Sequence, residues 1–170
     1  MIEPYHVLQY PTWVNVVALT SDTEILLVRQ YRHGVARILT ELPSGAVESS
    51  DENPEAAIRR ELMEETGFTG GEFFQIGCAY ANPANHNNLV WSFLAIGVQL
   101  TQELKLDFNE EVEVIREDFK EFIKQVWQGN LQLQGLHIAA LHFAVFFIFQ
   151  NQMPIFGKLR QELKENLIRE

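Results

Sequence analysis

The chain has 170 residues, of which 46% are hydrophobic and 11% aromatic, and this favours a single folded domain with a sizeable core over residues 1–170. Its 13 basic and 23 acidic side chains give a formal net charge of −10. That charge disfavours nonspecific binding to nucleic acid or to an anionic membrane, because both need a basic surface. Its one cysteine, Cys78, excludes an intramolecular disulfide framework. No secretory signal pattern opens the sequence, so we expect a cytoplasmic protein.

Two apolar runs, residues 13–20 and 24–31, flank a short polar connection. Both runs are rich in β-branched residues, which predicts a β-hairpin. In the first run Val14, Val16 and Ala18 alternate with residues that are also largely apolar, so we expect both faces of this strand to be covered.

A short helix with both ends marked follows a glycine-containing loop. Asn53 suits the N-cap, Pro54 suits the first helical position, and Gly67 suits the left-handed residue after the last turn. The sequence therefore predicts a helix between Pro54 and Gly67.

Three glutamates of this helix, Glu61, Glu64 and Glu65, share one face, because residues three and four apart are neighbours on a helix. Like charges at these spacings destabilise a helix by about 0.2–0.5 kcal/mol per pair. Arg60 projects about 100° away from Glu61 and cannot neutralise all three. A hard divalent cation would supply the missing charge and keep coordination positions for substrate phosphates. The alternative is a solvated acidic face, but the caps and the apolar neighbours of the glutamates favour a metal site.

This stretch resembles the Nudix box, G-x5-E-x7-R-E-U-x-E-E-x-G-U, in which U is a bulky apolar residue. Seven residues separate Glu52 from Arg60, and from Arg60 the sequence reads R-E-L-M-E-E-T-G-F, in register with the box. Six residues instead of five separate Gly45 from Glu52, which places one extra residue in the intervening loop. The flanking sequence, from about residue 13 to residue 144, is also similar to this family. The resemblance implies a Nudix-type α/β/α sandwich with a mixed β-sheet.

The resemblance also implies roles for the residues of the box. Mg²⁺, with Mn²⁺ as a possible substitute, is the expected cofactor. The carboxylates would bind the metal ion, and Arg60 would orient these carboxylates. Glu52 would assist the metal shell, and a backbone carbonyl before the helix would complete that shell. The implied metal ligands are Ser44 or Gly45 together with Glu61, Glu64 and Glu65.

Three further places resemble the ADP-ribose pyrophosphatase branch of the family. In R-Q-Y-R, Arg29 and Arg32 would face the substrate diphosphate, although each could be a surface ion pair. Pro83, fifteen residues past the end of the box, resembles a marker proline, although Asn-Pro is also an ordinary turn. Glu110, or next Glu111, resembles a loop glutamate that serves as general base or extra metal ligand; a solvated acidic loop is the alternative.

The remaining elements are expected from periodicity and caps. Strands are predicted over residues 72–81 and 89–98, a short strand over 112–114, and helices over 116–128, 136–150 and 157–170. The apolar helix 136–150 is too short for a membrane span and is expected to pack in the core or in the interface of a homodimer.

The predicted function is Mg²⁺-dependent hydrolysis of a nucleoside diphosphate linked to another group, with ADP-ribose, cleaved to AMP and ribose 5-phosphate, as the first candidate. Other nucleotide sugars and damaged nucleotides are alternative substrates. Outside the enzymes, a nucleotide-binding regulator with a vestigial site and an interaction module built on helix 136–150 are the alternatives. The expected partner is a small molecule, with neither nucleic acid nor membrane.

Overall fold

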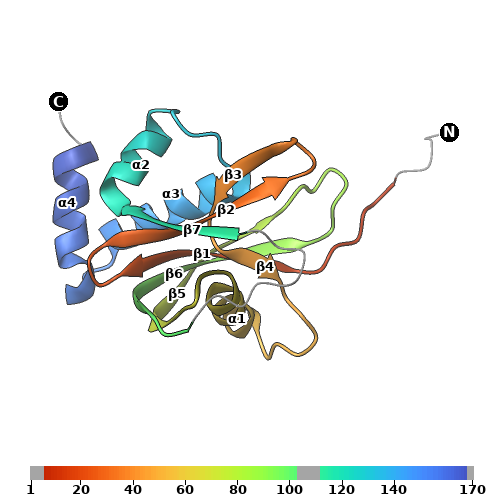
Figure 1. Ribbon diagram of the computed structural model, residues 1–170, viewed down its shortest axis with the longest axis horizontal. Coiled ribbons are helices and arrows are strands. Elements are labelled where there is room, and N and C mark those ends of the chain that lie inside the picture. The colour runs from red at the N-terminus through yellow and green to blue at the C-terminus, as the bar shows by residue number, and fades with distance from the viewer. Residues whose placement is uncertain (1–5, 103–111, 168–170) are drawn as a thin grey trace.

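The structure, a computed structural model, describes residues 6–102 and 112–167 of the chain (Figure 1). Four strands, one helix and three further strands come first, and the remaining helices gather toward the C-terminus. In chain order the elements are β1 (Trp13–Thr20), β2 (Glu24–Arg32), β3 (Arg37–Glu41), β4 (Ser44–Ala46), α1 (Pro54–Thr66), β5 (Phe68–Tyr80), β6 (Leu89–Leu100), β7 (Val112–Asp118), α2 (Phe119–Trp127), α3 (Gly135–Gln150), the 3-10 turn η1 (Pro154–Phe156) and α4 (Gly157–Leu167).

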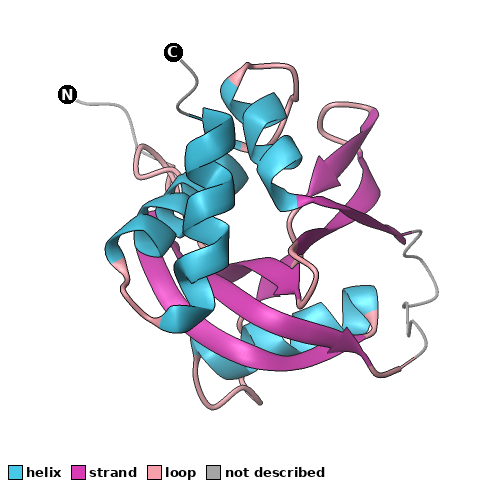
Figure 2. Ribbon diagram, turned by 90° about the vertical axis from the view of Figure 1, so that its left-hand side faces the viewer, coloured by secondary structure: helices cyan, strands magenta, loops and turns pink. Residues whose placement is uncertain are grey.

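The seven strands of the described chain form one mixed sheet in the order β3-β2-β1-β6-β5, with β4 also pairing with β1 and β7 with β2. β1 and β6 run parallel, whereas the other pairs are antiparallel. α1 covers one face of the sheet, and α2, α3 and α4 lie on the other (Figures 1 and 2). The predicted α/β/α sandwich with a mixed sheet is confirmed.

Both faces of β1 are buried, as its sequence predicts. Val14, Val16 and Ala18 pack with α1 in one hydrophobic cluster. Val17 and Leu19 point the other way, into a larger cluster with α2, α3 and α4. Side chains that point to either face of β1 are buried, because a central strand of a three-layer sandwich has no solvent-facing side.

The predicted hairpin of β1 and β2 exists only near its turn, where Leu19 pairs with Ile25. Beyond that point the strands diverge: β2 pairs with β3 and β7, whereas β1 pairs with β4 and β6. This divergence lets the turn between β3 and β4 reach the N-terminal end of β1, where Pro43 accepts a hydrogen bond from the backbone N–H of Val16 at 3.0 Å.

The predicted ends of α1 are confirmed. The Asn53 side chain accepts from the N–H of Ala56 at 2.9 Å, and Pro54 occupies the first turn. Gly67 takes a left-handed conformation, with φ of 73°, and its N–H donates to the carbonyl of Met63 at 2.8 Å. Two caps and a buried apolar face therefore fix the position of the glutamate-bearing helix.

The prediction of a helix over residues 116–128 is wrong at its start. β7 continues to Asp118, because Arg116 and Asp118 pair with Leu26 and Glu24 of β2. Asp118 then caps α2 by accepting from the N–H of Glu121 at 3.1 Å. Pairing with a distant strand overrides the local helical pattern here.

α3 lies across the sheet and buries six of its residues. No single helix of residues 6–102 and 112–167 is long and apolar enough to cross a membrane, although Gly135–Gln150 and Pro154–Glu165, bent by 116° at their break, meet the length and composition criteria as a pair.

Candidate functional site

The glutamate-bearing face of α1 meets the strand β4, which carries the predicted backbone ligands. The carboxylate of Glu61 lies directly against Gly45, since a Cβ atom added to this glycine would stand 2.0 Å from Glu61 Cδ. The backbone N–H of Ser44 donates to Glu65 Oε2 at 3.0 Å. Gly45 therefore leaves its backbone open to a carboxylate that a larger residue would displace.

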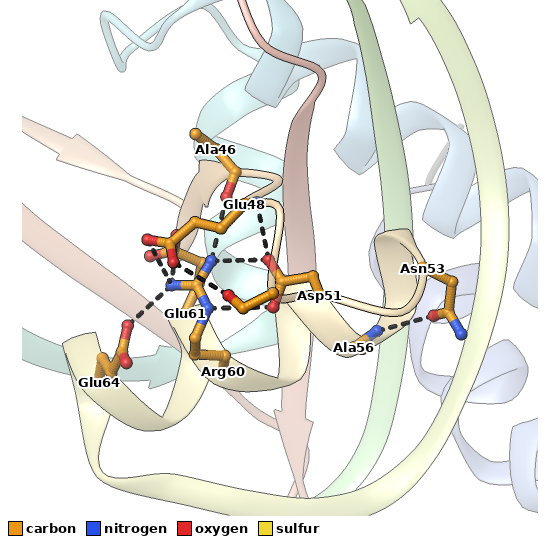
Figure 3. Close-up of polar contacts among 9 residues, drawn as sticks. Ala46, Glu48, Asp51, Asn53, Ala56, Arg60, Glu61 and Glu64 are labelled. Carbon is orange, nitrogen blue, oxygen red and sulfur yellow. Dashed lines mark hydrogen bonds and ion pairs between the residues drawn. The ribbon is translucent and has the colours of Figure 1, made fainter.

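Arg60 lies at the centre of the acidic residues (Figure 3). Its Nη1 donates to Glu61 Oε1 and Glu64 Oε2, both at 2.9 Å. Its Nη2 donates to the carbonyl of Ala46 and to Asp51 Oδ2, both at 3.1 Å. The helical period predicts that Arg60 points away from Glu61, but its long side chain curls back and bridges two of the three glutamates.

Asp51, and not Glu52, forms the ion pair with Arg60 that anchors the loop before α1. Asp51 Oδ1 accepts from Arg60 Nε at 3.2 Å, in addition to the contact of its other oxygen. The Arg60 guanidinium lowers the pKa of Asp51, and Asp51 is the largest cause of the raised pKa of Arg60. Glu52 is exposed. The six-residue spacing from Gly45 to Glu52 thus leaves Asp51, one position earlier, as the carboxylate that contacts Arg60.

Burial raises the pKa of Glu61 to about 7, because desolvation outweighs the attraction of Arg60 and is reinforced by Glu64 and Glu48. Surplus negative charge therefore surrounds a partly buried carboxylate. Carboxylates next to backbone carbonyls are the oxygen ligands that a hard divalent cation prefers. Both the type and the position of these residues therefore suit such an ion. Within the described residues no three His, Cys, Asp or Glu side chains converge on one point, since Arg60 lies between Glu61 and Glu64 and Glu65 turns to Ser44.

These groups surround a cavity of about 610 Å³, which we call the carboxylate cavity. Polar side chains dominate its wall, and Trp13 and Gln30 also line it. The predicted residues that it brings together are Arg32, Ser44, Gly45, Arg60, Glu61, Glu64 and Glu65.

A second cavity of about 850 Å³, the adjoining cavity, shares Trp13, Arg32 and Ser44 with the first. Arg32 is held at this junction by Glu41, both of whose oxygens accept from Arg32 Nε at 3.0 Å. Glu41 is only 3% exposed. A buried carboxylate needs its ion-pair partner, so this pair holds the guanidinium of Arg32 in place. The junction therefore presents a positioned guanidinium between the two cavities.

Other predicted residues lie elsewhere. Arg29 forms an exposed ion pair with Glu113 at 3.0 Å and is not among the residues that line either cavity, which favours the surface-pair interpretation. Pro83 is exposed in the loop between β5 and β6 and likewise lines neither cavity of the described chain. Glu110 and Glu111 lie outside the described residues.

His137, at the start of α3, is a further residue of this region that sequence reasoning missed. It is 1% exposed, and its Nδ1 accepts from the backbone N–H of Leu42 at 3.3 Å. Burial lowers the pKa of His137 to about 4, and its Nε2 has no hydrogen-bond partner among the described residues. The neutral ring thus ties α3 to the turn before β4. No local pattern could have indicated this contact, because 95 positions separate the two residues.

With this geometry in view, comparison with known proteins decides the family. A family model for the NUDIX domain matches residues 10–133. The chain belongs to the Nudix family. Nudix hydrolases generally use a divalent metal, which agrees with the chemistry of the carboxylate cavity.

The relatives of this Nudix chain have names that state different activities. The ADP-ribose pyrophosphatase of Bacillus subtilis (strain 168) is 34% identical over 121 residues, which make up 71% of this chain and 65% of that protein. The methanol dehydrogenase activator of Bacillus methanolicus is 26% identical, over 74% of this chain and 68% of the relative. The GDP-mannose pyrophosphatase of Yersinia pestis (strain Pestoides F) is 28% identical, over 76% and 68%. The chain thus spans just under two thirds of the length of the Bacillus subtilis relative.

A solved structure described as an ADP compounds hydrolase superposes with a TM-score of 0.70 and 18% identity, over 84% of this chain and 77% of that one. At this identity the likeness concerns the fold, and it confirms the Nudix architecture expected from the sequence.

Proposed function

We propose that this Nudix protein hydrolyses a nucleoside diphosphate linked to another group, with ADP-ribose as its first substrate and AMP and ribose 5-phosphate as products. The observation that carries the proposal is the carboxylate cavity, in which Glu61, Glu64 and Glu65 stand next to the backbone of Ser44 and Gly45. The Bacillus subtilis relative, an ADP-ribose pyrophosphatase at 34% identity, supports this choice of substrate.

The cofactor that we propose is Mg²⁺, with Mn²⁺ as a substitute. Glu61, Glu64 and Glu65 would hold it, together with a backbone carbonyl of Ser44 or Gly45. Such an ion neutralises diphosphate oxygens and lowers the pKa of a bound water. Burial raises the pKa of Glu61, so a nearby cation would stabilise the ionised form of this carboxylate, which lacks solvation.

The side chains around the ion have separate tasks in this proposal. Arg60, anchored by Asp51, keeps the carboxylates of Glu61 and Glu64 oriented toward the cavity. Arg32, fixed by Glu41, contributes a positive group for the diphosphate at the junction of the two cavities. A water attacks one phosphorus atom, the P–O bond to the bridging oxygen breaks, and two monophosphates result. Glu110, or next Glu111, is proposed as the base that takes the proton of the water.

The direct test is incubation of the purified protein with ADP-ribose and Mg²⁺, with the products identified by chromatography. We expect AMP and ribose 5-phosphate in equal amounts, and no turnover when the metal is chelated. Hydrolysis of a nucleoside triphosphate without hydrolysis of ADP-ribose would overturn the substrate while keeping the reaction class. Absence of metal-dependent turnover on every diphosphate tried would favour a binding regulator.

A second substrate class is supported by the GDP-mannose pyrophosphatase relative at 28% identity. The same carboxylate cavity would cleave the diphosphate of a nucleotide sugar, since the group beyond the diphosphate takes no part in the chemistry. A panel of ADP-ribose, GDP-mannose and other nucleotide sugars, compared by kcat/KM, separates the two classes.

We also propose a single domain over residues 1–170, a cytoplasmic location and a homodimer. The support for a dimer is α3, where the large apolar side chain of Phe146 is 61% exposed, close to Phe143, which is 36% exposed and lies against Gly77 of β5. Sedimentation of wild type at micromolar concentration should give a dimer, and Phe146→Glu should shift it toward monomer. A wild-type monomer would contradict this assignment.

A further inference from the structure

Three polar residues form a row across the middle of the sheet, which we call the buried polar row: Ser44, Asn15 and Ser92. Asn15 of β1 pairs with Ser44 of β4 on one side and with Ser92 of β6 on the other. All three are buried. Partners on adjacent strands point to the same face of a sheet, and Asn15 shares its face with Val17, which packs in the cluster with α2, α3 and α4. The row therefore faces the helical layer.

α3 lies close over this row. Next to Ser92, Phe143 covers Gly77 of β5 so closely that a Cβ atom added to the glycine would overlap the ring. Near the other end of the row, His137 accepts from the backbone N–H of Leu42 at 3.3 Å, two residues before Ser44. Apart from His137, the helix buries only apolar side chains, namely Ala140, Leu141, Ala144, Val145 and Ile148. His137 is thus the one buried polar side chain that α3 brings toward the row.

The side chain of Asn15 is 0% exposed, and neither its Oδ1 nor its Nδ2 forms a hydrogen bond with any described residue. His137 Nε2 is likewise unpaired within this part of the chain. Because Nδ1 of the same ring accepts a hydrogen bond, the neutral imidazole carries its proton on Nε2, which is therefore a donor. Buried polar atoms of folded proteins almost always have a partner, so these three atoms require one that the chain itself does not supply.

The geometry suits a small partner between the two side chains. Leu42, whose N–H binds His137, is two residues from Ser44, the partner of Asn15, and two residues of a strand span about 7 Å. Neither Asn15 nor His137 lines either cavity of the described chain, so the partner is enclosed. A water molecule accepts as well as donates, so it can accept from Nε2 and donate to Oδ1. Buried waters typically make about three hydrogen bonds of this kind.

We propose that ordered water is a structural ligand of this protein, bound between β1 and α3 by the side-chain amide of Asn15 and by Nε2 of His137, and that it holds α3 against the turn that presents Ser44. Ser44 and Gly45 supply the backbone wall of the carboxylate cavity, and the N–H of Ser44 donates to Glu65. Asn15 and His137 are then positioning residues, which act on the divalent ion through the backbone of β4. This second step rests on the proposed function for the position of the ion.

The first test detects the water by NMR on the intact protein labelled with ¹⁵N. The Nδ2 protons of Asn15 and the Nε2 proton of His137 should show nuclear Overhauser contacts to water, with the sign of a bound molecule. Ser92→Ala is the control, because it removes a neighbouring hydroxyl proton that could relay the signal, and the contacts should persist in this variant. An Asn15 amide that bonds directly to a protein group and shows no contact to water would overturn the proposal.

The second test uses a matched pair at one position, Asn15→Thr and Asn15→Val. The two side chains have the same shape and both suit a strand, but only threonine keeps a hydroxyl that can bind water. Asn15→Val should weaken binding of Mn²⁺, measured by electron paramagnetic resonance, by about 10–100-fold, the usual cost of losing a group that holds metal ligands in place. Asn15→Thr should retain most of the affinity and melt at a higher temperature than Asn15→Val. Equal Mn²⁺ affinities for the pair would overturn the positioning role.

The outcomes separate this inference from the proposed function. Hydrolysis of ADP-ribose by a protein without the NMR contacts overturns the water site alone. A wild type that binds no Mn²⁺ overturns the proposed metal site and with it the positioning role, whereas the NMR contacts still decide whether water is bound. Should Asn15→Val fail to fold while Asn15→Thr folds, the need for a polar group at this position is supported, and the contacts in wild type remain the deciding measurement.

Discussion

The carboxylate cavity and the adjoining cavity share three residues but are built in different ways. Most of the first comes from one continuous stretch, from Ser44 to Glu65, whose helix and loop fold onto themselves. The second is assembled from β1, the β2–β3 loop and the segment before α3, which lie far apart in the chain. A continuous motif can determine the class of reaction. Residues scattered along the chain line the rest of the site, and they determine which group beyond the diphosphate can bind. This difference explains how relatives that share the Nudix fold can act on different substrates.

The largest expected effect is in the carboxylate cavity. Glu65→Gln keeps the shape of the side chain but removes one charged ligand, so kcat should fall by about 100-fold or more, because metal stabilisation of charge in the transition state is worth several kcal/mol. Stability should change little. The matched control is Glu55→Gln on the same helix, where Glu55 forms an exposed pair with Arg59. Near-normal kcat in Glu65→Gln at ordinary Mg²⁺ concentrations would contradict the assignment of this residue.

The contact between β4 and α1 can be broken from the backbone side. In Gly45→Ala the new Cβ would lie 2.0 Å from Glu61 Cδ, so the glutamate must leave its place. Because the clashing atoms are the far end of a flexible side chain, the carboxylate can swing away, and we expect a large loss of activity with little change in unfolding free energy. Gly157→Ala is the control, since a Cβ there meets nothing within 4 Å. Equal activities for the two variants would show that the contact is not needed.

The junction of the cavities can be tested through its arginine. Removing Arg32 alone would leave Glu41 buried and unpaired, so the informative variant is the double change Arg32→Gln with Glu41→Gln. Its KM for ADP-ribose should rise by about tenfold to a hundredfold, because a charge-assisted hydrogen bond is worth about 1.5–3 kcal/mol. Arg29→Gln should leave KM unchanged, since Arg29 pairs with Glu113 on the surface. The reverse pattern would restore Arg29 as the substrate-binding residue.

His137, which ties α3 to the turn before β4, should make stability depend on pH. Its folded pKa of about 4 lies below the unfolded value of 6.5, so the unfolded chain binds the proton first and stability falls as pH drops from 6.5 toward 4. Between pH 7 and pH 5 this term amounts to about 2 kcal/mol. Glu61 acts in the opposite direction over part of this range, because its pKa is raised to about 7.

The measurement is therefore the difference between wild type and His137→Leu in unfolding free energy at the two pH values. The variant should lose less stability than wild type on acidification. His142→Gln is the control, since His142 is exposed on the same helix. Identical pH dependence in wild type and His137→Leu would contradict the burial argument.

The sequence by itself determined the helix, its caps and the shared face of its glutamates. These features depend on residues three or four apart, or on single cap positions, so local physical chemistry is sufficient for them. The alternation of β1 likewise determined that both of its faces are covered. The resemblance to the Nudix box then supplied the family, which the comparison confirms.

Only the tertiary structure decided which carboxylate anchors Arg60, where the helix α2 begins, and which residues stand beside the glutamates. Asp51 rather than Glu52 contacts Arg60. The loop has one extra residue, and the spacing of residues along the sequence does not show which carboxylate its conformation brings to Arg60. Arg29 and Arg32 look equivalent in R-Q-Y-R, yet one faces Glu113 at the surface and the other meets buried Glu41 at the cavity junction. Trp13 and His137 gain their positions from strand pairing and helix docking across the whole chain. Contacts of this kind depend on how segments that are distant in the sequence pack against one another. That packing depends on the whole core and cannot be derived from any one segment.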